Sequence, residues 1–244
     1  MFDRRTVLIA SSVFTTSMFA TSRAFSEGKK AVSNEACKQA AKLEFREAKL
    51  FPMAAGPGTP RNEEVAKAFR LLFGVGTPSS PIAAAEYFSK LQDKNKDQEF
   101  YREEWKAARA NPMIVGFFGM TQTLPSDGDQ TAWCAAFVNF CLFAAGFVGT
   151  ESALSGSFRS YGSASTTPTR GDIVVFRKPG GAGNDGHGHV GFYFGEEGDR
   201  LLVLGGNQAS PGSTGGVKVA SFPRSSGSLE LHSFRSSESF KRIA

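Results

Sequence analysis

The sequence has few of the residues that build metal sites and disulfide frameworks. It contains three histidines and three cysteines in 244 residues. His187-x-His189 lacks the further Asp, Glu or His ligands that a zinc site needs, so we expect neither a metal nor another cofactor. Lysine and arginine are scattered and no nucleic-acid-binding motif is present, which excludes a nucleic-acid partner. No run of about 20 apolar residues occurs, so we expect no stable membrane insertion of the mature chain.

The first 24 residues have the features of an export signal. An arginine pair, Arg4-Arg5, precedes a mildly apolar stretch (residues 7–20), and Ser-Arg-Ala at 22–24 is a small-x-small cleavage site. The arginine pair favours a twin-arginine signal, with a general secretory signal as the alternative. We therefore expect residues 1–24 to be removed and the mature protein to be exported, to the periplasm or the extracellular space.

The three cysteines do not form an obvious disulfide framework. Cys134 and Cys141 are seven residues apart on one predicted helix, about 10.5 Å along its axis. A disulfide needs Cα atoms within about 7 Å, so these two cannot pair while the helix holds. Cys37 could pair with Cys141, or Cys141 could be a small buried hydrophobic residue, which we favour. An odd cysteine in an oxidising compartment suggests that one thiol is kept for chemistry.

Residues 131–142 form a predicted buried helix that carries Cys134 near its first turn. Cap-type residues precede it, its side chains are mostly apolar, and Gly146 ends it. The helix dipole and the free N–H groups of the first turn favour a thiolate at such a position. Downstream, His189 opens an apolar strand and Asn207 ends another. Cys, His and Asn in this order, on a helix followed by strands, are typical of a papain-like nucleophile site.

Five segments in this order resemble the CHAP and NlpC-type cysteine amidohydrolase/peptidase superfamily: WCAAFVNFCL, GTESALSGSF, GDIVVF, GHVGFYFGE and LVLGGNQ. The resemblance covers residues 111–234. It implies an α+β fold with a papain-like core, in which an N-terminal catalytic helix packs on an antiparallel sheet of five to six strands, with an extra helical N-terminal region. It also implies a bacterial cell-wall hydrolase with Cys134 as nucleophile, His189 as base and Asn207 orienting the histidine.

Alternatives remain for several of these roles. His187 would share the strand face of His189, but the GHVGF segment falls on His189, and we expect His232 to be an ordinary sheet or surface histidine. Asn207 could instead be a turn residue. The oxyanion hole would use the Cys134 backbone N–H, with Gln130 as a candidate second donor. In the family a proline often precedes the Gly-Asp pair at 171–172, where this chain has an arginine.

The rest of the chain carries no chemical motif. We expect a linker with a short helix at 25–61, a helical region at 62–110 that packs on the core, and the hydrolase domain at 111–244. Apolar runs at 173–176 and 201–204 indicate a sheet covered on both faces, with the Cys134 helix on one face and the 62–110 helices as candidates for the other. Aromatic residues at 100, 101 and 105 could stack on sugars, but core packing is the default interpretation.

The sequence therefore predicts an exported, monomeric cysteine hydrolase that acts on peptidoglycan or muropeptides through a thioester. Two other classes stay open: a catalytically silent wall-binding module on the same fold, and a cysteine acyltransferase or transpeptidase in which an amine replaces water.

Overall fold

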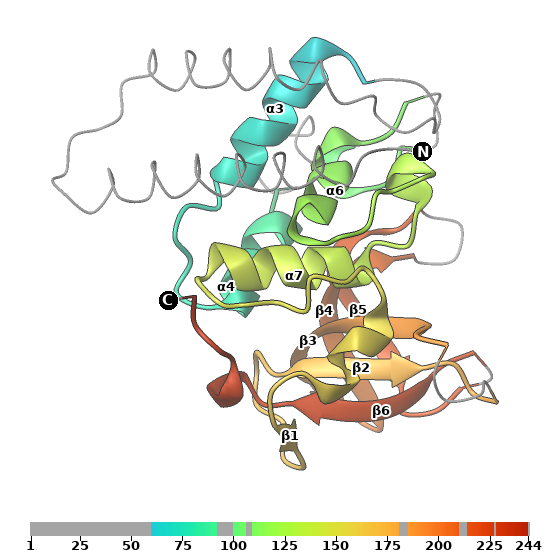
Figure 1. The fold of residues 1–244 in the computed structure, drawn as a ribbon. Coiled ribbons are helices and arrows are strands. Elements are labelled where there is room, and N and C mark those ends of the chain that lie inside the picture. The colour runs from blue at the N-terminus through green and yellow to red at the C-terminus, as the bar shows by residue number, and fades with distance from the viewer. Residues whose placement is uncertain are drawn as a thin grey trace, which may run out of the picture. The chain divides into compact units, whose positions relative to one another are not determined.

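A computed structural model describes residues 60–91, 100–105, 109–180, 185–209, 214–226 and 228–243. These residues form an α+β fold with helices beside a six-stranded antiparallel sheet (Figure 1), which confirms the predicted fold class and is compatible with a papain-like core. The predicted signal peptide, Cys37 and nearly all of the predicted linker lie outside the described residues. None of the described helices is long and apolar enough to cross a membrane.

The helical elements are α3 (Asn62–Phe73), α4 (Pro81–Ser89), α6 (Pro112–Phe117) and α7 (Cys134–Ala144), with the 3-10 turns η1 (Phe100–Arg102), η2 (Phe118–Met120), η3 (Gly128–Gln130), η4 (Ser155–Ser160) and η5 (Ser237–Ser239). The strands are β1 (Ala164–Ser165), β2 (Ile173–Arg177), β3 (Gly188–Glu197), β4 (Arg200–Gln208), β5 (Gly216–Pro223) and β6 (Glu230–Arg235). Their order in the sheet is β1-β6-β2-β3-β4-β5. Strands β2 to β5 thus follow one another as antiparallel neighbours, and β6 returns to pair with β2.

The first helices begin and end where local sequence signals predict. Glu64 accepts a hydrogen bond from the Arg61 backbone N–H at 2.7 Å, and α3 ends before Gly74, as its apolar spacing indicates. Ser80 caps α4 by accepting from the Ala83 N–H at 3.3 Å. In the part of the predicted helical region around the aromatic residues that the structure describes, residues 100–105, the helical element is the short turn η1.

Helix α7 begins at Cys134, three residues later than the sequence suggested. Trp133 occupies the N-cap position without a side-chain cap, and all residues from 134 to 142 are buried. Asp129, expected as a cap-type residue, is instead fully buried and accepts from the backbone N–H groups of Trp105 (2.7 Å) and Asn111 (2.9 Å). Cys141 is a buried free thiol, in agreement with its interpretation as a hydrophobic core residue.

Two cores lie on opposite faces of the sheet. The helix-covered core contains Cys134, Phe137, Val175, Val190 and Phe192 together with residues of α3, α4 and α6. The strand-lined core contains Val174, Phe176, Leu201, Val203 and Phe234.

The assignment of the 62–110 helices to the second face is therefore wrong. These helices pack beside α7 on the first face, as Figure 1 shows for α4 and α7. The second face buries apolar side chains of the strands against one another, since the described residues around it come from the strands and the turn before β6. Tyr101 and Trp105 are buried in the helix-covered core, so they are not an exposed sugar-stacking surface.

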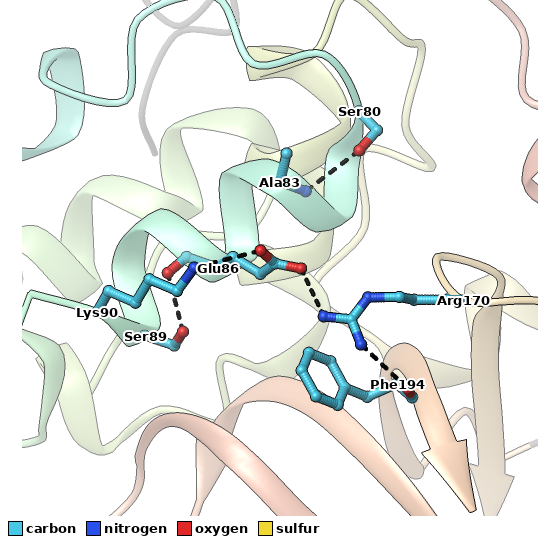
Figure 2. A network of polar contacts seen from close by, with 7 residues as sticks. All are labelled: Ser80, Ala83, Glu86, Ser89, Lys90, Arg170 and Phe194. Carbon is cyan, nitrogen blue, oxygen red and sulfur yellow. Dashed lines mark hydrogen bonds and ion pairs between the residues drawn. The ribbon is translucent and has the colours of Figure 1, made fainter.

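Arg170 connects α4 to the sheet (Figure 2). The family often has proline at this position. Its guanidinium lies 2.9 Å from the Glu86 carboxylate of α4. The same group lies 3.6 Å from the centroid of the Phe194 ring of β3 and donates to the Phe194 backbone oxygen. One side chain thus combines an ion pair, a cation–π contact and a hydrogen bond between the N-terminal helices and the sheet.

Candidate active site

Cys134 occupies the first position of α7 and is 5% exposed. Burial raises the pKa of its thiol to about 11, and hydrogen bonds from the backbone N–H groups of Val190, Ala135 and Cys134 itself pull that pKa down less strongly. Backbone N–H donors beside a sulfur favour a thiolate or an oxyanion. In this structure burial has the larger effect on the pKa of the thiol, so the thiol is protonated at neutral pH. The thiolate expected from the helix terminus is not the resting form.

His189 is the second residue of β3, and its imidazole enters the strand-lined core. It pairs across the sheet with Phe176, whose side chain is in that core. Its ring stacks on Phe222 with centroids 5.2 Å apart, and its Nε2 is buried without a hydrogen-bond partner. Burial lowers the pKa of His189 to about 4, so the ring is neutral at pH 7.

The sulfur and the imidazole therefore belong to opposite faces of β3. Adjacent residues of a strand point to opposite faces, and Val190 faces the helix-covered core together with Cys134. The sulfur meets the strand at the Val190 backbone N–H, one residue from His189. The structure thus brings the predicted nucleophile to the predicted strand position, while the ring of His189 points away from it.

Asn207 is the penultimate residue of β4 and has a left-handed conformation with φ of 59°. In the orientation that satisfies its neighbours, its amide nitrogen donates to Glu104 Oε1 at 2.9 Å. Its oxygen then accepts from the Trp133 backbone N–H at 3.2 Å. The amide thus holds the residue before Cys134. The structure brings Asn207 to the nucleophile helix, and the partners that it satisfies there do not include a nitrogen of His189.

The remaining candidates lie at the surface. Gln130, proposed as an oxyanion donor, is exposed at the end of η3, four residues before Cys134. His187 is exposed, and its backbone oxygen accepts from Arg159 at 3.1 Å. His232 is also exposed, which agrees with its interpretation as a surface histidine of the sheet. The described residues contain no group of three or more His, Cys, Asp or Glu side chains able to hold a metal ion.

Two glycines of the sheet allow a close approach of neighbouring elements. A Cβ at Gly206 would lie 2.3 Å from Trp133 Cζ3 and 2.9 Å from Phe137 Cβ, so this residue admits the first turn of α7. Gly191, two residues after His189 in β3, does not have that function. A Cβ there would instead lie 2.6 Å from Val203 Cγ1, so its role is to let β3 and β4 approach each other.

Glu104 is the site residue that the sequence analysis missed. It accepts from the Trp133 indole Nε1 at 2.9 Å and from the Gly215 N–H at 3.1 Å, besides the Asn207 amide. No motif surrounds it, and it precedes the segments that resemble a known family. Only the three-dimensional structure reveals its contacts, because its partners follow it by 29 to 111 residues.

Comparison with known proteins identifies the family of this region. Residues 126–207, about a third of the chain, match the family model of the CHAP domain, and this segment contains Cys134, His189 and Asn207. No curated protein and no solved structure matches the chain. The matched segment is narrower than the resemblance at 111–234 but lies inside it. The match of residues 126–207 to the CHAP domain is consistent with a domain of the CHAP/NlpC-type cysteine amidohydrolase/peptidase superfamily.

Proposed function

We propose that this protein is an exported cysteine hydrolase that cleaves an amide or peptide bond in bacterial peptidoglycan. CHAP domains are typically hydrolases acting on peptidoglycan, and the match supports a cell-wall amidase or peptidase. The observation that carries the proposal is the environment of Cys134. This thiol lies at the start of a buried helix, within the matched segment, and its sulfur accepts from the backbone N–H groups of Val190, Ala135 and Cys134 itself.

The reaction would proceed through a thioester. The Cys134 sulfur loses its proton to the His189 imidazole and bonds to the carbonyl carbon of the wall peptide. The C–N bond then breaks, and the imidazolium gives its proton to the leaving amine. Water attacks the thioester and regenerates the thiol. In this proposal the backbone N–H of Cys134, with the Gln130 amide as second donor, stabilises the oxyanion.

This chemistry requires the side chains of Cys134 and His189 to be arranged differently from the way they lie in the structure. A thiol with a pKa of about 11 and an imidazole with a pKa of about 4 do not form an ion pair at neutral pH. The His189 ring must leave its contact with Phe222 and come within about 3 Å of the sulfur, the reach that a general base needs. His187, exposed two residues earlier, is the rival base.

Mass spectrometry of fragments released from purified sacculi tests the proposal. We expect the wild-type protein to release muropeptides with a new amine terminus, and Cys134→Ala to release none while still binding sacculi. His189→Ala should abolish turnover and His187→Ala should preserve it. The reverse pattern would make His187 the base. Turnover that survives in Cys134→Ala would refute the cysteine mechanism.

One observation favours a second candidate, a wall-binding module without catalysis. The neutral thiol and the neutral imidazole lie on opposite faces of β3, and the fold in this arrangement is compatible with a papain-like core. If the protein were such a module, the wild type would bind sacculi as tightly as the Cys134→Ala variant does and would release no fragment. Adding an amine acceptor to the same digest would also reveal transfer, because a transpeptidase would attach the amine to the released carbonyl.

A further inference from the structure

A carboxylate outside the matched CHAP segment holds the beginning of α7. Glu104 follows η1, and its two oxygens receive three hydrogen bonds. Oε1 accepts from the Trp133 indole and from the Asn207 amide, both at 2.9 Å, and Oε2 accepts from the Gly215 N–H at 3.1 Å. Trp133 immediately precedes the thiol residue, so these bonds converge at the helix start.

The surroundings of this carboxylate leave it little freedom. The Glu104 backbone N–H donates to the Gly215 oxygen at 2.9 Å, so main chain and side chain are fixed by the same loop residue. A Cβ at Gly215 would lie 2.2 Å from Glu104 Oε1 and 2.8 Å from the Asn207 amide. Asn207 itself has a positive φ, a conformation that persists only where neighbouring contacts enforce it.

A carboxylate also decides which way a neighbouring amide points. An Asn side chain has one end that donates and one that accepts, whereas an ionised carboxylate only accepts. Glu104 therefore selects the orientation in which the Asn207 nitrogen faces it. In this orientation the Asn207 oxygen receives the Trp133 backbone N–H at 3.2 Å.

On the basis of the proposed function, we infer that Glu104 is a positioning residue of the Cys134 site. It fixes the Asn207 amide and the Trp133 indole, and through both it fixes the first turn of α7. The region before the CHAP segment thus completes the site and does more than cover the core.

Three variants of the full-length protein test this role. Glu104→Gln offers donors where three donors already converge, and Asn207→Asp places two carboxylates at about 2.9 Å, so both should loosen the helix start. In the double variant Glu104→Gln/Asn207→Asp, the new amide can donate to the new carboxylate, which restores this pairing. The Trp133 indole N–H, which shares Oε1 with the Asn207 amide in the wild type, then loses its acceptor. Glu103→Gln is the matched control. It makes the same substitution at the neighbouring glutamate, whose carboxylate pairs with Arg102 at 3.7 Å.

Two readouts are measured: fragment release from sacculi, and iodoacetamide labelling located by mass spectrometry. We expect each single variant to lower turnover roughly tenfold, the effect of one lost hydrogen bond to a charged group. Labelling of Cys134 should become faster because the closed thiol opens, while labelling of Cys141, buried further along α7, stays unchanged. The double variant should recover part of both effects, because the 104–207 pairing returns while the bond to the Trp133 indole does not.

The inference is wrong if the single variants label Cys134 at the wild-type rate, or if Cys134 and Cys141 label faster together, which indicates general destabilisation. It is also wrong if the effects of the two substitutions multiply in the double variant. Should Asn207→Asp not fold, the comparison of Glu104→Gln with Glu103→Gln decides alone. A wild-type protein without turnover would refute the proposed function, and the labelling of Cys134 would still decide the role of Glu104.

Discussion

The protonation of His189 gives a test of the site geometry that needs no substrate. In the strand-lined core the pKa of His189 is lowered to about 4, from about 6.5 in an unfolded chain. The unfolded state therefore takes up a proton as the pH falls below about 6.5, while the folded state does not until about pH 4. The free energy of unfolding falls as the pH is lowered through this window. Above about pH 6.5 the protonation of His189 no longer affects it.

The size of the effect follows from the two pKa values. With 1.36 kcal/mol per pKa unit, the loss relative to pH 7 is about 2 kcal/mol at pH 5 and about 3 kcal/mol at pH 4. Urea unfolding at pH 7, 6, 5 and 4 measures it. Other groups also titrate in this range, so the quantity to compare is the difference between wild type and His189→Phe, a variant whose ring can still stack on Phe222. His187→Gln, an exposed position, is the control and should follow wild type.

The result that refutes this geometry is the absence of the acid loss. An imidazole outside the core would have an ordinary pKa in the folded and in the unfolded state, so the curves of wild type and His189→Phe would run parallel. An ion pair between His189 and the Cys134 thiolate would also lose stability on acidification, because below about pH 6.5 the unfolded chain binds a proton on each group and the pair holds only one. The rate of Cys134 alkylation separates the two cases, because the ion pair would already contain a reactive thiolate at neutral pH.

Further predictions concern the Cys134 thiol, the contacts between α4 and the sheet, and the start of α7. Alkylation of folded wild-type protein at Cys134 should keep rising tenfold per pH unit up to about pH 10, because the pKa of the thiol is about 11, and a plateau below pH 8 would contradict this. Arg170→Ala should lower the free energy of unfolding by about 1 kcal/mol in urea, since it loses the partly exposed ion pair and the cation–π contact. Lys90→Ala, which removes only a 3.5 Å ion pair to the same glutamate, should change it by less than about 0.5 kcal/mol. Gly206→Ala should cost about 1–3 kcal/mol by the same measurement, because its Cβ would overlap the Trp133 ring, and an unchanged midpoint would contradict the close approach.

Local sequence signals predicted the elements well because their causes are local. The apolar spacing of 62–73 and the following glycine indicated α3, and the structure has a helix over those residues. The alternation along β3 separated His189 and Tyr193 from Val190 and Phe192, and the structure places these pairs on opposite faces. The start of α7 was misplaced, because Asp129 makes its bonds to Trp105 and Asn111, contacts that no local pattern reveals.

Alternation alone could not predict which face of β3 receives α7. It divides the residues of a strand into two sets, and the packing of distant elements decides which set meets the helix. The same limit applies to Glu104, whose partners Trp133 and Gly215 are 29 and 111 residues away. The sequence could identify candidate groups for catalysis, but their mutual orientation depends on tertiary contacts.

The opposite placement of sulfur and imidazole locates the movement that catalysis would require. In the described ladder, β3 pairs with β2 from Gly188 onward, but its pairing with β4 begins only at Phe192. The residues from His189 to Gly191 therefore have regular strand pairing on one side alone, so turning this strand start breaks fewer hydrogen bonds than moving Phe192, which pairs with both neighbouring strands. The ring would leave a site where its Nε2 has no partner and burial disfavours its charge, and it would gain the sulfur as a partner. Both changes favour the arrangement in which the imidazole faces the sulfur. The acid dependence of the free protein and the turnover of His189 variants must therefore be measured together.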